Sequence, residues 1–346
     1  MNNDKTIAAV LAILEAQGLS AEDVLAAASH EHRQAVVPTV EEYLPSVIEA
    51  TTEGAAKTYR TYWNQLVAAH GTKRLNEVRV SHLDALALSA AKTAVVRSNH
   101  RNGISARENC VGALRAFFET ARKDGLVTKN LALDVKKPKR KTSRRRPLTD
   151  EEIEELSAAT LVGDDPSLDL LLFRFHLETG ARRGGALALR LRDLDFRRQC
   201  VRLREKGVTE RWQPVSLTLI SALADHAQCR GAHHADDPVF RRLPHQGATV
   251  GVPVSRRRYN TLVEHWHTGC PWAAELGVSI HWLRHTALAT VERLSGSLSI
   301  ARAFAGHHSE ADVTLSYIKA SEVEVAEVVA LMTGEPHPLA PATMTP

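Results

Sequence analysis

The sequence has no hydrophobic run long enough to cross a membrane, and its start does not resemble a secretory signal. A spanning helix needs about 18 consecutive apolar residues, and no stretch of the 346 residues approaches that length. The first lysine, Lys5, has the acidic Asp4 beside it, which does not fit the basic start of a signal peptide. These absences predict a soluble, cytoplasmic protein with no membrane partner.

Cysteine is scarce and widely spaced. Cys110, Cys200, Cys229 and Cys270 form no Cys-x-x-Cys pair, so they cannot build a zinc ribbon or a thioredoxin-like redox motif, and we expect reduced thiols. The 44% of hydrophobic and 24% of charged residues exclude collagen-like, wholly disordered and disulfide-scaffold classes. At about 100 to 200 residues per domain, the length predicts two domains.

Positive charge is concentrated in one segment. The net charge is only +4, but residues 136–146 (KKPKRKTSRRR) hold eight basic residues and no acidic one. From Glu310 onward, six acidic residues face one basic residue, which argues against a nucleic-acid-binding arm there. Taken alone, the basic run is either a solvated linker or localisation tag, or a segment that binds phosphates.

Apolar stripes with helical spacing predict a small helical bundle over residues 37–133. The stripes are Tyr59, Tyr62, Trp63, Leu66 and Val67; Leu83, Leu86 and Ala87 behind a Ser81 cap; and Val111, Leu114, Phe118 and Ala121 ending near Gly125. Residues 1–36 form a helical appendage to which we assign no chemistry. The basic linker spans 134–148.

A second module begins where the linker ends. Pro147 favours extended backbone at Arg146, and Thr149 with Glu152 forms a capping box. Between 194 and 217, apolar and basic residues alternate around a Lys206-Gly207 turn, which predicts an antiparallel hairpin. The fold class is therefore mainly α with a small antiparallel sheet. We place the second domain at 149–333 and a disordered, proline-rich tail at 334–346.

Several residues of the second module could act on an anion. Arg182 follows Glu178-Thr179-Gly180-Ala181 at the junction of two predicted helices, where a planar guanidinium can face an oxyanion. His281, Arg284 and His285 share one helical face behind a Ser279 cap because they are three or four residues apart. Such cations in an apolar helix need an anionic partner, and a phosphate is the obvious one.

Each candidate also has an ordinary interpretation. Arg182 could be a surface arginine and Lys206 a solvated turn lysine, while Tyr317 could be a buried structural tyrosine. Gly306-His307-His308 precedes Tyr317 in the chain. The order and spacing of all these segments, rather than any one of them, favour a shared function.

Read together, the segments over residues 37–332 resemble the tyrosine recombinase (phage integrase) family. Thr179-Gly180-Ala181-Arg182 followed by ALALRLRDLD is similar to the first arginine box of that family, and Lys206 in a hairpin is similar to its mobile lysine. His281-x-x-Arg284-His285 is similar to its second box, and Gly306-His307 followed by Tyr317 to its third. The resemblance implies a helical core-binding domain followed by an α+β catalytic domain of the integrase type.

The resemblance also implies a role for each residue. Arg182 and Arg284 would bind the non-bridging oxygens of the scissile phosphate, and His307 would donate a further hydrogen bond. Tyr317 would attack phosphorus to leave a 3′-phosphotyrosyl link, with His281 as proton acceptor and Lys206 as proton donor to the 5′-hydroxyl. His285 would be structural. The reaction needs no ATP, metal ion or other cofactor.

The implied partner is double-stranded DNA with paired recombination sites. The basic residues of the linker would contact its backbone: Lys136, Lys137, Lys139, Arg140, Lys141, Arg144, Arg145 and Arg146. The resemblance implies a homo-tetramer on DNA, with accessory DNA-bending proteins as further partners. Ser321 and Glu324 predict a last capped helix, whose apolar face has little sequence left to cover it, so we expect it to dock on a neighbouring protomer.

The sequence departs from the family pattern at three places. Gly185 stands where an acidic residue is usual, Leu131 follows Asn130 where proline is usual, and the interval from His307 to Tyr317 is one residue longer than expected.

Other functions remain open at this point. A mobile-element integrase and a chromosome-dimer resolvase would use the same chemistry, as would a monomeric relaxing enzyme of the type IB topoisomerase kind.

A metal hydrolase is an alternative from another class, because the sequence has seventeen histidines. However, no Glu follows His281 as a zinc-binding His-Glu-x-x-His motif requires. A catalytically inactive DNA-binding regulator is disfavoured because all six functional positions are filled. Tyr259, after three arginines, is the other tyrosine of the second module, and nearby charge could acidify its phenol.

Overall fold

The computed structural model describes residues 37–94, 103–139, 145–205, 209–306 and 321–341, with a few positions between 13 and 22. The chain divides into two compact units, Met1–Lys141 and Thr142–Pro346. The division falls within the segment 134–148, for which the sequence predicts a basic linker. The predicted appendage at 1–36 lies largely outside the described residues.

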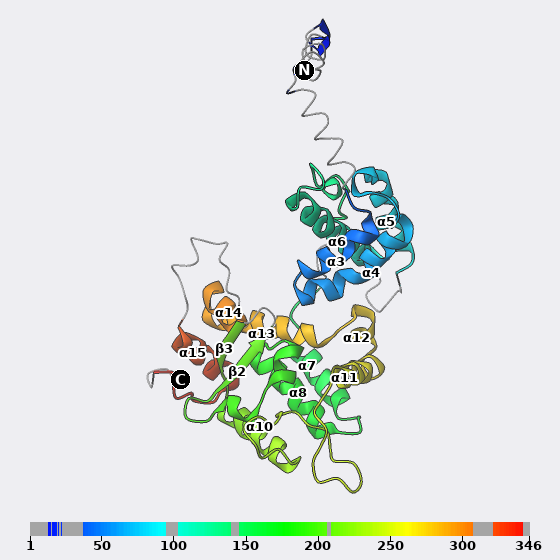
Figure 1. Ribbon diagram of the computed structural model, residues 1–346. Helices are drawn as coiled ribbons and strands as arrows, with labels where there is room; N and C mark the ends of the chain where they lie inside the picture. The colour runs from blue at the N-terminus through cyan, green and yellow to red at the C-terminus, as the bar shows by residue number, and fades with distance from the viewer. Residues whose placement is uncertain are drawn as a thin grey trace. The chain divides into compact units, whose positions relative to one another are not determined.

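The described part of the first unit is helical (Figure 1). Its elements are α3 (Val40–Glu49), α4 (Glu53–His70), the 3-10 turn η1 (Leu75–Glu77), α5 (Val80–Lys92), α6 (Ile104–Lys123) and η2 (Leu131–Leu133). Thr39 and Glu42 form a capping box at the start of α3. The predicted Ser81 cap is wrong, because Arg79 is the N-cap of α5 and the His82 ring accepts the Arg79 amide proton at 3.2 Å.

Asn130 explains one departure from the family pattern. Its side chain accepts the Ala132 amide at 3.1 Å and donates to the Arg115 carbonyl at 3.0 Å. It is thus the cap of η2 and joins that turn to α6. Leu131 takes the first position of η2, so this turn forms without proline.

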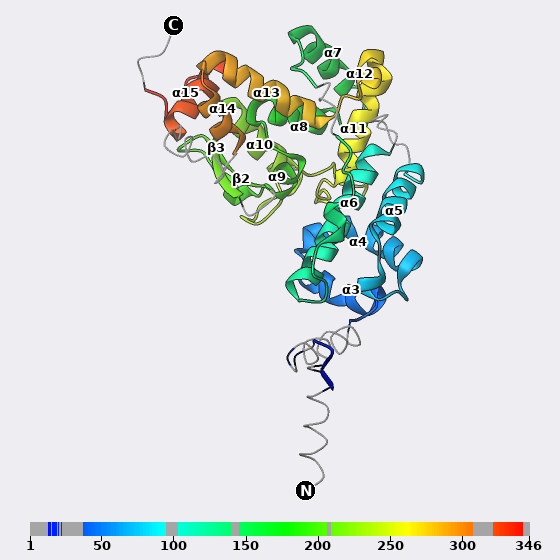
Figure 2. The ribbon, with the colours of Figure 1, turned by 90° about the horizontal axis from the view of Figure 1, so that it is seen from above.

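The described part of the second unit combines helices with a small sheet (Figures 1 and 2). Its helices are α7 (Asp150–Thr160), α8 (Pro166–Thr179), α9 (Arg183–Ala188), α10 (Leu217–Cys229), α11 (Arg256–Gly269), α12 (Pro271–Leu276), α13 (Ile280–Ser295), α14 (Leu298–Ala305) and α15 (Glu322–Thr333), with a 3-10 turn η3 (Leu191–Asp193). Helix α7 begins with the predicted capping box of Thr149 and Glu152. The described elements confirm a mainly α fold with a small antiparallel sheet. In the described ranges, no helix is long and apolar enough to cross a bilayer.

The sheet has three antiparallel strands in the order β1 (Leu194–Asp195), β2 (Cys200–Glu205) and β3 (Thr209–Pro214). Val201 pairs with Gln213 and Leu203 with Arg211. The predicted hairpin is therefore present on both sides of residues 206–208, which lie outside the described residues.

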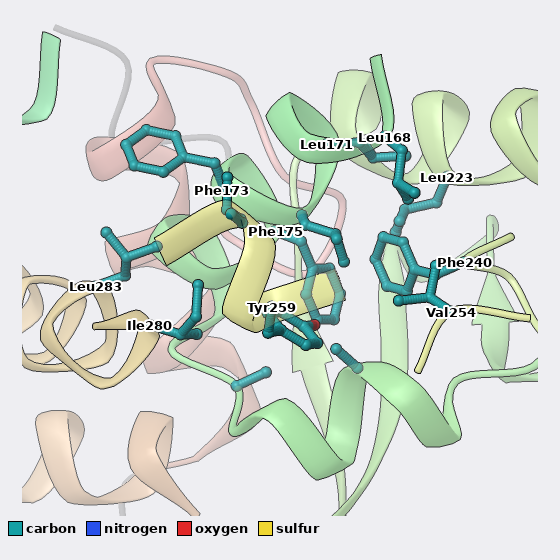
Figure 3. Close-up of a cluster of buried hydrophobic side chains, with 14 of the residues drawn as sticks. Leu168, Leu171, Phe173, Phe175, Leu223, Phe240, Val254, Tyr259, Ile280 and Leu283 are labelled. Carbon is teal, nitrogen blue, oxygen red and sulfur yellow. The ribbon is translucent and has the colours of Figure 1, made fainter. Parts of the chain in front are cut away.

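The core of the second unit lies between α8, α11, α13 and the sheet. Side chains from all of them form one buried apolar cluster, part of which Figure 3 shows, with Phe175 from α8 beside Tyr259 from α11 and Phe173 on the side of Leu283 from α13. This packing fixes the C-terminal end of α8 relative to α13. Both carry predicted site residues.

Helix α15 packs on its own unit. Ser321 and Glu324 form the predicted capping box, but the apolar face is covered in cis: Val325, Val328 and Val329 are buried with residues of α13 and α14. The expectation that this face lacks sequence to pack against is therefore wrong. Side chains distant in sequence supply the missing partners.

The predicted disordered tail is also wrong for residues 334–341. Glu335 accepts the Thr218 amide at 3.1 Å, and the buried His337 contacts the Gln199 carbonyl through Nε2 at 3.0 Å. Polar anchors therefore hold a proline-rich segment that composition alone assigns to disorder.

Candidate active site

The first arginine of the site follows a tight turn between two helices. Helix α8 ends at Thr179, and Gly180 caps it with a φ of 58°, which glycine adopts without strain. A Cβ on Gly180 would lie 2.8 Å from the Phe304 ring, so the close approach of α14 also requires glycine. Arg182 then takes the N-cap position of α9 and is half-buried.

The second arginine, Arg284 on α13, is buried, with 2% of its surface exposed. Its guanidinium donates through Nη1 to the Gly180 carbonyl and through Nη2 to the Ala305 carbonyl at 2.6 Å. Both carbonyls lie at helix C-terminal ends, where intrahelical donors run out. Arg284 thus joins the turn before Arg182 to the end of α14.

His281, in the first turn of α13, is neutral at physiological pH. Loss of hydration, and then the positive charges around it, lower the pKa of His281 to about 4, although the residue remains partly exposed; the charged groups are Arg145, His285, Arg284 and Arg182. Its ring packs edge to face on His285, with ring centroids 4.9 Å apart. A neutral imidazole among three arginines can accept a proton.

The last part of the basic segment is anchored close to α13. The buried Leu148 donates its amide to the Thr286 hydroxyl of α13 at 3.0 Å. Three residues earlier, Arg145 is exposed, and its charge lowers the pKa of His281. An arginine of the linker thus acts on the candidate base, which no motif in the sequence indicated.

The predicted DNA-contacting residues of the linker divide between the two units. Lys136, Lys137 and Lys139 belong to the first unit and Arg145 and Arg146 to the second, while Arg140, Lys141 and Arg144 lie outside the described residues. Lys137 pairs with Glu108 at 3.4 Å. Arg146 pairs with both carboxylate oxygens of Glu152, at 2.5 and 2.6 Å. These pairs neutralise part of the run.

The structure therefore brings together Arg182, His281 and Arg284. Lys206, His307 and Tyr317 lie outside the described residues. Their roles remain predictions from the sequence. What is described is their chain neighbourhood: β2 and β3 on both sides of Lys206, and Gly306, the C-cap of α14, directly before His307.

Tyr259 is not a candidate nucleophile. It is fully buried, and its hydroxyl lies 2.9 Å from Nε2 of the buried His176. Burial raises the pKa of Tyr259 rather than lowering it, so the hypothesis of an acidified phenol is wrong. The arginine directly before it, Arg258, is buried and pairs with the buried Asp169.

His176 is a supporting residue that the motif comparison missed. Its Nδ1 contacts the Ala181 carbonyl at 2.8 Å, so the His176–Tyr259 pair holds the backbone next to Arg182. The signal in the sequence is a polar ring in the apolar helix PSLDLLLFRFHLET, six residues before Arg182.

Glu178 is buried beside the Arg182 turn, but its carboxylate binds Ser216 and Arg174. Its carboxylate accepts the Ser216 amide at 2.6 Å and lies 3.5 Å from Arg174. Burial raises the pKa of Glu178. It anchors the end of β3 to α8, while Gly185, where an acidic residue is usual, is buried in α9.

The histidines do not assemble a metal site in the described part of the chain. No group of three or more His, Cys, Asp or Glu side chains there could hold a metal ion. Two candidates have structural contacts instead: His267 binds the Val278 carbonyl through Nε2 at 2.8 Å, and His281 packs on His285. Ser279 is the N-cap of α13 as predicted, without a side-chain cap hydrogen bond.

Comparisons with known proteins agree with this geometry. The model of the phage integrase family matches residues 146–323, more than half of the chain. Tyrosine recombinase XerC of Xylella fastidiosa strain M23 is 28% identical over 265 residues, covering 75% of this chain and 83% of the relative. The protein of the same name from Shewanella amazonensis is 26% identical over 211 residues, covering 60% and 69%.

Solved structures share the fold. A lambda integrase tetramer bound to a Holliday junction superposes with a TM-score of 0.60 at 15% identity, covering 92% of this chain and 86% of that one. The Tn1549 transposon integrase in complex with transposon right end DNA gives 0.61 at 17% identity, covering 86% and 99%. Together with the matched family model, the arrangement of Arg182, His281 and Arg284 shows that this chain belongs to the phage integrase family, the tyrosine recombinases.

Proposed function

We propose that the protein is a site-specific DNA recombinase that breaks and rejoins strands through a 3′-phosphotyrosyl intermediate. The observation that carries the proposal is the grouping of two arginines with a neutral histidine, supplied by the Arg182 turn and by α13. Two neighbouring cations suit the developing charge of a phosphoryl transition state. A neutral imidazole beside them suits removal of the phenol proton.

In the proposed reaction, Tyr317 attacks the scissile phosphorus in line. The phenol proton passes to His281, the P–O bond to the 5′-oxygen breaks, and Lys206 protonates that oxygen. His307 donates a hydrogen bond to the phosphate. Because the phosphotyrosyl bond retains the energy of the phosphodiester, a 5′-hydroxyl of another strand can reverse the step on a new partner without ATP, metal or cofactor.

Arg284 has a preorganising role in this scheme. Its bonds to the Gly180 and Ala305 carbonyls hold the guanidinium in place before DNA binds. Less reorganisation is then needed when the phosphate arrives, which is the condition under which electrostatic stabilisation is most effective.

The proposed partner is duplex DNA with paired sites. We propose a homo-tetramer on DNA, supported by the lambda integrase tetramer on a Holliday junction, with the basic segment 136–146 along the phosphate backbone.

Exchange of α15 between protomers remains part of the proposal. It requires release from the cis cluster, and the same apolar face would then pack on the equivalent cluster of a neighbour. Accessory DNA-bending proteins and a cytoplasmic, nucleoid-associated location complete the proposal.

Two biological roles, a dimer resolvase and a mobile-element integrase, fit the proposed chemistry. The similar proteins include XerC recombinases as well as the lambda and Tn1549 integrases, so an experiment must distinguish the two roles. Mapping protein-protected DNA in the encoding replicon should reveal two inverted half-sites around a short spacer. A monomeric relaxing enzyme would instead remove supercoils from any plasmid and form no synaptic complex.

The deciding experiment uses a nicked suicide substrate that contains the mapped site. The wild type should become covalently joined to a 3′-phosphate through a peptide that contains Tyr317, with equal yield in EDTA. Tyr317→Phe should bind the DNA and form no adduct. Tyr259→Phe removes a hydroxyl that supports the Arg182 turn but not the nucleophile, so it should still form the adduct, at a lower rate. An adduct from Tyr317→Phe, or full loss of activity in EDTA, would overturn the mechanism.

A further inference from the structure

The inner face of the β2–β3 hairpin carries an arginine among apolar side chains. Leu203 pairs with Arg211 and Val201 with Gln213, and paired residues of adjacent strands lie on the same face of a sheet. Val201 and Leu203 are fully buried in the core of the second unit. Arg211 is therefore a cation directed toward the interior rather than toward solvent.

The Arg211 guanidinium reaches the end of α14. Its Nη1 donates to Oε1 of Gln213, and its Nε and Nη2 are shielded from solvent. Gly306, the C-cap of α14, has a φ of 65°, and a Cβ there would lie 2.6 Å from Nε and 2.7 Å from Cδ of Arg211. The side chain thus packs directly on the Gly306 backbone, an approach that only glycine permits.

Two arginines from different elements therefore meet at this helix end. Arg284 of α13 binds the Ala305 carbonyl at 2.6 Å, and Arg211 of β3 packs on the next residue, Gly306. In the sequence, His307 follows Gly306, and Lys206 lies between the residues of β2 and those of β3. One side chain thus connects the strand after the lysine turn to the residue before His307.

We propose that Arg211 is a positioning residue of the strand-cleavage reaction, which locks the hairpin bearing Lys206 to the end of α14 that leads into His307. The inference rests on the proposed function and on the proton-donor role of Lys206. Gln213 of the same strand holds the guanidinium, and Nε and Cδ of Arg211 pack on the Gly306 backbone, so the link between the hairpin and α14 is one of close packing. Arg211 itself does not contact the reacting atoms.

Two suicide substrates test this role. One has the ordinary 5′-oxygen leaving group; the other has a bridging 5′-sulfur, which leaves as a thiolate and needs no proton. Arg211→Ala should slow cleavage of the oxygen substrate about 10- to 100-fold, the loss expected when a catalytic group is misplaced by about 1 Å. It should cleave the sulfur substrate at close to the wild-type rate, as Lys206→Ala should, whereas Arg182→Ala should be impaired on both.

The matched control lies on the other face of the same hairpin. Arg202 binds Asp193 at 2.8 Å and stacks on Trp212, so Arg202→Ala loosens the hairpin without touching Gly306. The positioning role would be excluded if Arg211→Ala slowed cleavage of both substrates equally. It would also be excluded if the sulfur substrate restored the cleavage rate of Arg202→Ala in the same way.

If Arg211→Ala melts below the assay temperature, Arg211→Met, which keeps the stem against Gly306, is measured on the same two substrates. No sulfur rescue of Lys206→Ala would instead refute the proton-donor role.

A double-mutant cycle tests the contact itself. Gly306→Ala places a Cβ against Arg211 in the wild type, but only the strain of the positive φ remains once Arg211 is alanine. The Gly306→Ala change should therefore cost less activity in the Arg211→Ala background than in the wild type. Purely additive effects would show that the contact does not couple the two elements.

Discussion

The cores of the two units are built from different side chains. In the first unit, the buried cluster is apolar and aromatic, with Tyr43 packed edge to face on Phe117, and Asn130 is the one buried polar side chain among its described residues. The second unit buries ion pairs, including Arg258 with Asp169 and Arg230 with Asp165. The difference teaches that apolar burial is enough to build a helical bundle, whereas placing a charged site requires buried polar links.

The buried links of the second unit converge on the elements that carry the site. Arg258 joins α11 to α8, and the His176–Tyr259 pair does so again nearer the Arg182 turn. Arg284 then joins α8 to the end of α14. Buried pairs are poor sources of net stability but good sources of fixed geometry when fully hydrogen-bonded.

The largest effect should follow removal of one partner of a buried pair. Arg258→Met leaves the fully buried Asp169 without its two hydrogen bonds of 2.6 and 2.7 Å, which should lower the free energy of unfolding of the second unit by about 3–5 kcal/mol. Urea denaturation measures it. Arg242→Met is the control, because its pair with Asp164 at 3.7 Å is exposed and should matter by less than about 1 kcal/mol. Similar effects of both changes would remove the distinction between buried and exposed pairs.

An apolar deletion in the first unit should have a somewhat smaller, local effect. Leu114→Ala removes a fully buried side chain from α6 and should cost about 2–5 kcal/mol. Hydrogen exchange should speed up within residues 37–135 and stay unchanged in the second unit. Leu88→Ala, at an exposed position of α5, is the control. Equal loss of protection in both units would contradict the separate cores.

The charge around His281 should be measurable directly. Its pKa is lowered to about 4 by lost hydration and then by Arg145 and its other cationic neighbours, so the neutral, proton-accepting form should persist from pH 8 down to about pH 5. An NMR titration of the ring should give a midpoint near 4. Arg145→Gln should move the midpoint upward, because one cation that opposes protonation is gone. A wild-type midpoint near 6.5 would show that the ring is solvated and uninfluenced by the arginines.

The smallest effect concerns the first-unit end of the basic segment. If Lys136, Lys137 and Lys139 each neutralise a phosphate, changing them to glutamine should make the slope of log affinity against log salt shallower by about 0.9 per lost contact. Arg122→Gln, whose side chain pairs with Glu119 at 2.7 Å on the surface of α6, is the control. An unchanged slope would make this part of the run only a tether.

Local signals predicted much of the fold. The stripe around Trp63, the capping boxes of Thr149 and Ser321, and the alternation at Val201 and Leu203 depend on residues within a few positions of one another. Such patterns act through backbone hydrogen bonds and periodicity. The predicted Ser81 cap was wrong because α5 begins two residues earlier, with Arg79 as its N-cap and the His82 ring accepting the Arg79 amide proton.

Predictions about what covers a surface were less reliable. The apolar face of α15 is covered by residues of α13 and α14, and His337 in the tail contacts the Gln199 carbonyl, 138 positions earlier in the chain. The prediction of an acidified Tyr259 phenol was wrong for the same reason. The neighbours of Tyr259 in sequence are arginines, but its neighbours in space are His176 and an apolar cluster. No local pattern contains that information.

The sequence by itself determined which residues resemble the family boxes, that the fold is mainly helical with one hairpin, where α7 and α15 begin, and where the positive charge lies. The tertiary structure alone decided that Arg284 holds the Gly180 and Ala305 carbonyls together and that His281 stays neutral. The reason is physical: identity and periodicity are properties of adjacent residues. Burial, hydrogen-bond partners and pKa depend on groups that only folding brings within a few ångströms.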